Sequence, residues 1–487
     1  MIGPGSLSLV ERTMPLLLFA FLLAGCSKEP GLTTSSQEAL RLYQDGVAQW
    51  ERFYYREAKE SFEKALGYDS SFAMAWARLA AVSQANQDEA QSLKQMDRAM
   101  QLRGHTTRRE QLLIRMYDRR FRYDFKSAKE IADSLVRLYP DEKEAYIVLG
   151  YIHQLNNNFE AAIRSYEKAV EVDTAYALAY MYIGYAYSNL GEQEKALSNM
   201  KRYIQLAPDG ADPRASYADL LMRVGRYDEA LEQYQKALAL KPDYWYSFNQ
   251  IGYIDLLRGR LRDAEMMFQR SLKMRPSTRG LESSHLAVAG AVNIYRGKYR
   301  EALELYTSAL SIDSTNGSAA GGMVFALARM KEFKQAWLVI ERIHQEYMRR
   351  NLLSATPMLG FHLMKANLLM EEGRLGEAVT ECDSAREFAD PLTRGDVYAG
   401  LAEIYFRAKS YDEALDASEE ALRLNPNAPA ALLTLVRIYH AIGDHEMTGE
   451  IGGRLLELWK GADPDFQRLL ELKKLLRVGT TSASVHT

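Results

Sequence analysis

Residues 146–173 read YIVLGYIHQLNNNFEAAIRSYEKAVEVD, and residues 180–209 read YMYIGYAYSNLGEQEKALSNMKRYIQLAPD. The two stretches place the same kinds of residue in the same order, with Gly150 and Gly184 in equivalent positions 34 residues apart. In each stretch, apolar residues recur every three or four positions on both sides of a short polar turn, which is typical of two amphipathic helices. The pattern therefore predicts a helix–turn–helix unit that occurs more than once.

The same unit returns along most of the chain, for example in FNQIGYIDLLRGRLRDAEMMFQRSLKMRP from Phe248. A small residue in the first helix lets the partner helix approach closely, and an alanine opens the second helix. Four residues after that alanine, a bulky side chain fills the layer, as at Phe62, Tyr166 and Tyr234. Prolines such as Pro208 and Pro242 then end the second helix, because the residue before a proline disfavours the helical region.

On these residues the chain resembles the tetratricopeptide repeat (TPR) family, from Gln37 to about Arg477. The resemblance implies an all-α TPR solenoid of about twelve repeats, forming a right-handed superhelix with a C-terminal capping helix. We predict one superhelical domain over residues 37–477 and a disordered tail over 478–487. A loop is predicted from Asn351 to Met358, after an irregular unit that starts at Gly317. The twelve first helices are expected to start near Ala39, Ala73, Arg109, Lys143, Ala177, Ala211, Trp245, Ser283, Gly317, Leu359, Gly395 and Pro429.

The N-terminal region carries a second signal. Residues 16–26 read LLLFAFLLAGC, an apolar run that is too short to span a bilayer, which takes about 20 residues. A short apolar core that ends on small residues is typical of a signal peptide, here residues 1–25. The motif LAGC resembles the lipobox of bacterial lipoproteins, which implies acylation of Cys26, a linker over residues 26–36 and a palmitate-type lipid anchor in the cell envelope. Ser27 after the cysteine suggests the outer membrane, facing the periplasm. The alternative is an ordinary leader in which Cys26 is incidental.

The composition fits a folded repeat region, with 47% hydrophobic and 26% charged residues. A formal net charge of −3, from 61 basic and 64 acidic residues, argues against general binding of polyanions, and no nucleic-acid partner is expected. If Cys26 is acylated, Cys382 has no cysteine to pair with. The fold must then be held together by packing alone.

No constellation of catalytic residues is evident. The segment from Gly290 to Lys298 departs from phosphate-loop spacing, and His440 and His445 are five residues apart, which does not suit one metal ion on a helix. Cys382 occupies the bulky position of its helix and is expected to be buried. Acidic pairs such as Asp228 and Glu229 recur at one repeat position, which favours charges at helix N-termini. We therefore predict a protein that is not an enzyme and holds no cofactor and no metal.

Basic and aromatic residues alternate in RREQLLIRMYDRRFRYDFK, residues 108–126. Tyr117 and Phe121 are one helical turn apart, so the favoured interpretation is a packed aromatic face beside solvated arginines. An acidic protein, a lipid head group or an anionic glycan remains as an alternative ligand of these basic residues.

A functional hypothesis comes from the repeat register. In TPR proteins the first helices line the concave face of the superhelix, where partners bind. Tyrosines follow the small residue at multiples of 34, and polar residues lie about one turn away; the alternative is that the tyrosines only cap the core between helices. The predicted partner-binding groove consists of Tyr117, Arg120, Tyr151, Gln154, Tyr185, Asn189, Asp219, Arg223, Asn249 and Tyr253.

These observations predict a lipid-anchored scaffold or adaptor that binds a partner protein or peptide in the cell envelope. One alternative is a structural subunit of an envelope secretion or polysaccharide-export assembly, which would dock through its second helices and the irregular unit from Gly317 to Met358. Another is a ligand-sensing arm, since the second and third units resemble the TPR arms of bacterial kinase and winged-helix regulators.

Overall fold

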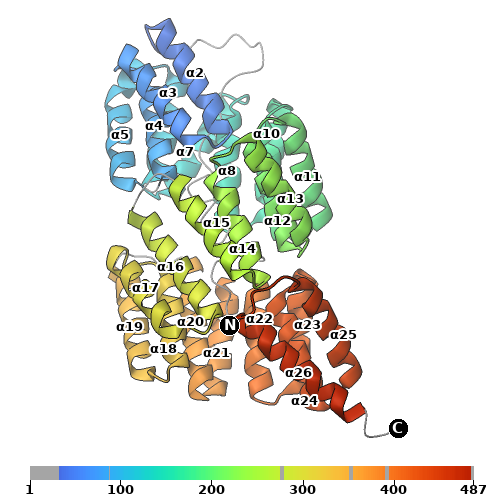
Figure 1. Ribbon diagram of the computed structural model, residues 1–487. Coiled ribbons are helices and arrows are strands. Elements are labelled where there is room, and N and C mark those ends of the chain that lie inside the picture. Colours follow the sequence, from blue (N-terminus) through green and yellow to red (C-terminus); the bar gives the residue numbers. More distant parts are fainter. Residues whose placement is uncertain (1–31, 87, 275–278, 350–354, 390–393, 484–487) are drawn as a thin grey trace. The chain divides into compact units, whose positions relative to one another are not determined.

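The computed structural model describes residues 32–86, 88–274, 279–349, 355–389 and 394–483 (Figure 1). In these residues the chain forms twenty-five α-helices, α2 to α26, with one 3₁₀ turn at Arg103–His105 and no strand. The helices form twelve consecutive pairs followed by α26, so the prediction of an all-α repeat protein is confirmed. No helix in the described ranges is long and apolar enough to cross a membrane. The predicted leader and Cys26 lie outside these ranges.

The bounds of the helices follow the repeat. The first helices of the pairs are α2 (Gln37–Glu51), α4 (Ala73–Ala85), α6 (Arg108–Phe121), α8 (Lys143–Leu155), α10 (Ala177–Asn189), α12 (Ala211–Arg223), α14 (Trp245–Leu257), α16 (Arg279–Tyr295), α18 (Gly317–Arg329), α20 (Ala355–Glu372), α22 (Arg394–Arg407) and α24 (Pro429–Ile442). The second helices are α3 (Tyr55–Tyr68), α5 (Glu89–Leu102), α7 (Phe125–Leu138), α9 (Phe159–Val172), α11 (Gln193–Leu206), α13 (Tyr227–Leu240), α15 (Leu261–Met274), α17 (Tyr299–Ile312), α19 (Phe333–Arg349), α21 (Leu375–Phe388), α23 (Tyr411–Leu424) and α25 (His445–Leu458). The last helix is α26 (Gln467–Ala483).

Ten of the twelve predicted starts lie within two residues of an observed first helix. The exceptions are α16 and α20, which each begin one helical turn earlier than predicted. Part of the loop predicted from Asn351 to Met358 is therefore helical from Ala355 onward, because a proline such as Pro357 is tolerated in the first turn of a helix. Helix α26 also continues past its predicted end at Arg477, since no proline follows to stop it, and the predicted disordered tail at 478–487 is helical as far as Ala483.

Packing within a repeat depends on the small residue of the first helix. At Gly150, a Cβ atom would lie 2.3 Å from Cε1 of Tyr166, whose ring is fully buried against the α8 backbone. Gly46 meets Phe62 in the same way, at 2.6 Å. The alanines that open the second helices, such as Ala162 and Ala196, are also fully buried. The helices of a pair thus approach closely at one recurring position of the repeat pattern.

The turn inside most pairs contains one residue with a left-handed backbone, with φ between +55° and +82°. Glycine occupies this position in several repeats, for example Gly191 and Gly443, because it adopts positive φ without steric cost. In other repeats the residue carries a side chain, and these are Phe53, Tyr123, Asn157, Lys331 and Lys409. The second helices α7, α11, α13 and α23 then each end two residues before a proline.

The repeat region divides into two compact units, with the boundary between Leu220 and Leu221 in α12. The prediction of a single superhelical domain did not anticipate this division. Within the unit that ends at Leu220, helices several repeats apart are in contact. The Tyr54 hydroxyl accepts a hydrogen bond from the Ala211 amide at 3.4 Å, and Arg78 of α4 pairs with Glu144 of α8 at 2.6 Å.

The unit that starts at Leu221 is closed by contacts between residues about 200 positions apart. The Trp459 indole donates to the Leu257 carbonyl at 3.0 Å, and the Asp463 amide donates to the Gly259 carbonyl at 2.9 Å. Asn425 donates from its side chain to the Tyr227 hydroxyl at 3.1 Å. A single apolar cluster joins α14–α16 to α24–α26 through residues such as Phe268 and Phe466. We call these contacts the closing seam, made by Gly225, Tyr227, Leu257 and Gly259 on one side and Asn425, Asn427, Trp459 and Asp463 on the other.

Candidate functional site

The ten residues of the predicted groove all lie on first helices, as the repeat register requires. Seven of them, as far as Asp219, belong to the unit that ends at Leu220, while Arg223, Asn249 and Tyr253 belong to the unit that starts at Leu221. They are distributed as Tyr117 and Arg120 on α6, Tyr151 and Gln154 on α8, Tyr185 and Asn189 on α10, Asp219 and Arg223 on α12, and Asn249 and Tyr253 on α14.

The four tyrosines of this stripe are buried, with 0% exposure for Tyr117, 3% for Tyr151 and Tyr185, and 7% for Tyr253. Arg120, Asn189 and Asp219 are buried as well. Buried rings of this kind pack between helices and do not offer contact area to a partner, which agrees with the alternative that the tyrosines cap the core. Only Gln154, Arg223 and Asn249 are partly exposed.

Specific contacts hold these side chains between neighbouring repeats. The Tyr185 hydroxyl donates to Asp219 at 3.1 Å, which links α10 to α12. The Arg120 guanidinium lies over the Tyr151 ring, 4.5 Å from its centroid, and its Nε and Nη1 atoms have no hydrogen-bond partner among the described residues. The Tyr166 hydroxyl donates to Gln154 at 3.2 Å. The stripe therefore works chiefly as a polar and aromatic connection between repeats.

A buried ion pair in the same unit was not predicted. Arg78 donates to Glu144 at 2.6 Å and to the Tyr43 hydroxyl at 3.1 Å, with both charged side chains almost fully buried. Burial raises the pKa of Glu144, and Arg78 opposes that rise by favouring the carboxylate. The two residues are 66 positions apart, so no repeat spacing points to their contact.

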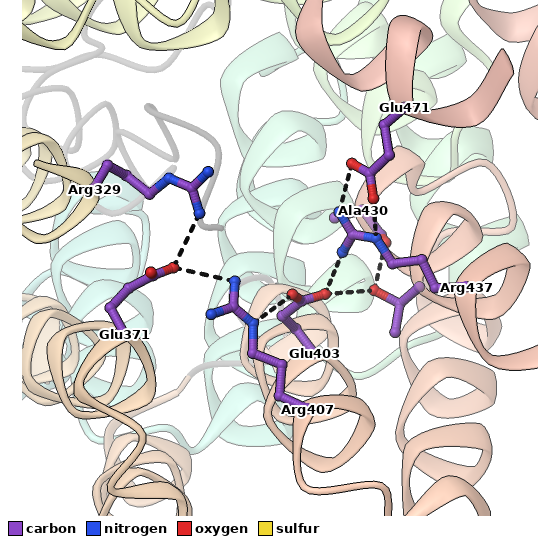
Figure 2. Close-up of polar contacts among 8 residues, drawn as sticks. Arg329, Glu371, Glu403, Arg407, Ala430, Arg437 and Glu471 are labelled. Atoms are coloured by element: carbon purple, nitrogen blue, oxygen red, sulfur yellow. Dashed lines mark hydrogen bonds and ion pairs between the residues drawn. The ribbon is translucent and has the colours of Figure 1, made fainter. Parts of the chain in front are cut away.

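A second polar system runs along the first helices of the unit that starts at Leu221 (Figure 2). Alternating arginines and glutamates connect α18 to α26, and we call this system the charge ladder. It consists of Arg329 on α18, Glu371 on α20, Glu403 and Arg407 on α22, Arg437 on α24 and Glu471 on α26.

Each step of the charge ladder is an ion pair. Glu371 accepts from Arg329 at 3.4 Å and from Arg407 at 3.1 Å. Arg407 also pairs with Glu403 at 3.0 Å, and Glu403 accepts from Arg437. Arg437 then holds Glu471 by two parallel bonds of 2.7 and 2.8 Å, the bidentate geometry that arginine favours with a carboxylate.

The centre of the charge ladder is buried, whereas its ends are accessible. The side chains of Glu371 and Glu403 are 5% and 10% exposed, but those of Arg329 and Glu471 are 36% and 39% exposed. Burial alone would raise the pKa of Glu403, but the positive charges of Arg437 and Arg407 outweigh burial and hold that pKa below its ordinary value. A sequence signal existed, because Glu403, Arg437 and Glu471 are each 34 residues apart.

The other residues considered for chemistry occupy structural positions. Cys382 is buried in its packing layer, and burial raises the pKa of its thiol to about 12, so it is not a reactive thiolate at neutral pH. Asp228 and Glu229 lie in the first turn of α13, as predicted, where Asp228 pairs with Arg258 at 2.8 Å. In the described residues, no group of three or more His, Cys, Asp or Glu side chains is placed to hold a metal ion.

Comparison with known proteins identifies the repeat. Tetratricopeptide repeat family models match residues 143–176, 178–210, 214–277 and 405–446. The first two segments each cover one helix pair and the turn that follows it. Residues 143–176 cover α8 and α9, and residues 178–210 cover α11 and all but the first residue of α10. No curated protein sequence matches the chain.

Among solved structures, the crystal structure of MamA is 26% identical and covers 33% of this chain and 93% of its own, with a TM-score of 0.29. PilW, described as a widely conserved type IV pilus biogenesis factor, is 15% identical and covers 40% of this chain and 89% of its own, with a TM-score of 0.36. Yeast Tom70 is 14% identical and covers 92% of this chain and 97% of its own, also with a TM-score of 0.36.

Proposed function

Because the chain is a tetratricopeptide repeat protein, we propose that it acts as a non-enzymatic scaffold that binds a partner protein or an extended peptide. TPR proteins in general bind protein partners, and here a connected series of ion pairs has two accessible ends. We place the binding surface on the charge ladder of α18–α26, where Arg329 and Glu471 are accessible at its two ends. This arrangement is the observation that carries the proposal, because charged groups at both ends suit a partner segment with an acidic and a basic side chain.

We further propose that acyl chains on Cys26 anchor the scaffold in the bacterial cell envelope, at the outer membrane and facing the periplasm. The LAGC motif behind a short apolar run supports this proposal. Several acyl chains give stable anchoring where one does not, because each buried CH₂ contributes about 0.8 kcal/mol. Mass spectrometry of the N-terminal peptide tests it, with Cys26→Ser as the control that should lose the acyl mass.

The binding surface is tested by affinity purification from detergent-solubilised membranes with the full chain. The variant Arg329→Ala with Glu471→Ala removes both accessible ends, while Glu371 keeps Arg407 and Arg437 keeps Glu403, so the buried charges stay paired. Recovery of the partner should fall in this variant. The matched control, Glu420→Ala with Arg423→Ala, removes an exposed ion pair on the second helix α23 and should retain the partner. Loss of the partner in the control alone would contradict the charge ladder as the binding surface.

A second candidate function, docking through the second helices as a structural subunit, is favoured by a separate observation. In the unit that ends at Leu220, apolar residues at the C-terminal ends of second helices are exposed: Tyr68 by 63%, Leu138 by 48% and Val172 by 38%. These three residues each end a second helix, and exposed apolar side chains that lie together are typical of a protein contact surface. Crosslinks that map to these three positions, with no effect of the Arg329→Ala and Glu471→Ala changes, would support docking through the ends of the second helices.

A further inference from the structure

The segment before α2 is attached to the body of the protein by specific hydrogen bonds. The amide and the hydroxyl of Thr33 donate to the Glu110 carboxylate at 3.0 and 2.5 Å. The Thr34 hydroxyl donates to Asp69 at 2.5 Å, and the Ser35 amide donates to the same carboxylate at 3.3 Å. The chain therefore enters the fold at a defined place, on the first turn of α6.

The same carboxylate connects this entry point to the segment between α5 and α6. Glu110 also accepts hydrogen bonds from the amide and the hydroxyl of Thr107, at 3.0 and 2.9 Å. Thr33 and Thr107 thus bind one side chain in common. The chain entry lies directly beside the residues that precede α6.

Those residues are basic and largely accessible. His105 and Arg108 are exposed, Arg103 is partly exposed, and Arg115 is exposed two turns further along α6. Within the described ranges none of these four forms an ion pair, whereas the neighbouring Arg109 is held by Glu142 at 2.6 Å. We call Arg103, His105, Arg108 and Arg115 the basic face.

The length of the chain between Cys26 and Thr33 limits how far this face can lie from a membrane. Thr33 lies seven positions after Cys26, and a fully extended chain spans at most about 3.6 Å per residue, or roughly 25 Å in total. With Cys26 acylated, Thr33 stays within that distance of the bilayer surface. A negatively charged surface attracts basic side chains over a Debye length of about 8 Å at physiological ionic strength, and the tether allows such an approach.

We propose that the basic face docks on the anionic bilayer surface and so sets the orientation in which the scaffold is held. This inference rests on the proposed lipid anchor. The structure supports it by binding Thr33, at the chain entry, and Thr107, next to Arg108, to one carboxylate, that of Glu110.

The test uses the full lipidated chain in vesicles, with a donor fluorophore on Gln101→Cys in the last turn of α5 and an acceptor on the lipids. Gln101 is exposed, whereas Cys382 is buried and does not label. Energy transfer should be stronger on vesicles that contain phosphatidylglycerol than on pure phosphatidylcholine vesicles. The gain should disappear in about 1 M NaCl, where the Debye length is about 3 Å.

The charge-reversal variant Arg103→Glu with Arg108→Glu should lose the same gain. The matched control, Lys201→Glu with Arg300→Glu, reverses two exposed charges on α11 and α17 and should keep it. Equal energy transfer on both kinds of vesicle, or a gain that survives charge reversal, would overturn the proposal. Equal transfer is the result expected if the basic face binds an acidic protein or a glycan instead of the bilayer. The mass of the N-terminal peptide is measured on the same sample. If Cys26 carries no acyl group, the proposed lipid anchor is wrong, and this result is distinguished from a failure of the basic face to bind.

Discussion

At the scale of single residues, the closest approach in several repeats lies between a glycine and a ring sixteen positions later. Gly150 and Tyr166 form one such contact, and Gly252 and Phe268 form another, in which a Cβ would meet the ring at 2.7 Å. Protein interiors are packed as densely as organic crystals, so a ring in this position cannot yield without a cost. The identity of the small residue therefore controls how closely the two helices pack.

We expect Gly150→Ala to lower the free energy of unfolding by about 1–3 kcal/mol, because its Cβ would overlap the buried Tyr166 ring. Chemical denaturation measures the change. Gly67→Ala on α3 is the control: nothing lies within 4 Å of a Cβ there, so the better helix propensity of alanine should leave stability unchanged or raise it by up to about 1 kcal/mol. Equal losses in both variants would contradict the close contact.

The charge ladder gives a prediction about pH. The pKa of Glu403 in the fold lies below its ordinary value of 4.5, so its ionised form stabilises the folded state. This stabilisation is complete above about pH 4.5 and is lost as the pH falls through the lower pKa of the folded protein. At neutral pH, Glu403→Gln should cost about 3 kcal/mol, because it leaves Arg437 and Arg407 without their central carboxylate.

Thermal melts of the native chain and of Glu403→Gln should therefore differ most at pH 7 and converge in acid. The exposed pair on α23 provides the control, because Glu420→Gln should change the melting temperature little at any pH. A difference that does not shrink on acidification would show that ionisation of Glu403 is not its cause.

At the scale of helices and turns, most of the fold could be predicted from the sequence. The start of a first helix, the small residue, the alanine and the terminating proline all depend on contacts inside one repeat or between neighbours, and those contacts recur at fixed spacing. The helical state of residues 279–282 and 355–358 was not predicted, because an extra turn at the start of a helix does not change the apolar periodicity of the residues that follow it. The tyrosine stripe was predicted on the right helices, but its burial depends on side-chain contacts between neighbouring repeats, such as Arg120 over Tyr151, which the 34-residue pattern does not specify.

The turns within the pairs offer a further prediction. Lys409 is exposed and has φ of +61°, a conformation that costs a residue with a side chain about 1–2 kcal/mol relative to glycine. Lys409→Gly should thus raise stability by about 1 kcal/mol, after allowing for the flexibility that glycine adds to the unfolded chain. Gly443, at φ of +82°, holds the same position one repeat later, and Gly443→Ala should lower stability by a similar amount. Denaturant titration measures the free energy of unfolding of both variants. Changes of the same sign in the two variants would contradict this explanation.

At the scale of the whole molecule, the contacts that matter most join residues far apart in sequence. The closing seam links positions 198–204 apart, and the buried pair of Arg78 and Glu144 links positions 66 apart. Such contacts depend on how much each repeat rotates relative to the last, which is the sum of many small packing differences. For that reason neither the seam nor the division at Leu220 could be predicted from the repeat pattern, whereas the 34-residue spacing of Glu403, Arg437 and Glu471 marks part of the charge ladder.

Trp459→Ala should destabilise the unit that starts at Leu221 by about 3–5 kcal/mol, because it removes a buried ring and its hydrogen bond to Leu257. Hydrogen exchange should show faster amide exchange in α14 and α15, about 200 residues earlier in the chain. Trp337→Ala is the control, since Trp337 bonds Glu372 and packs against α20 and α21. Its effect should stay within α18–α21, and loss of protection confined to α25 in the Trp459 variant would contradict closure through the seam.

The closing seam also determines the order in which this unit can be completed during synthesis. Successive helix pairs can pack on one another as they emerge from the ribosome, but Leu257 and Gly259 have no partner until Trp459 and Asp463 have been made. Closing a loop of that length carries an entropic cost that local contacts do not. The nascent chain thus holds α14 and α15 without these contacts while about 200 further residues are synthesised, and the unit is closed only when its last helices have been released.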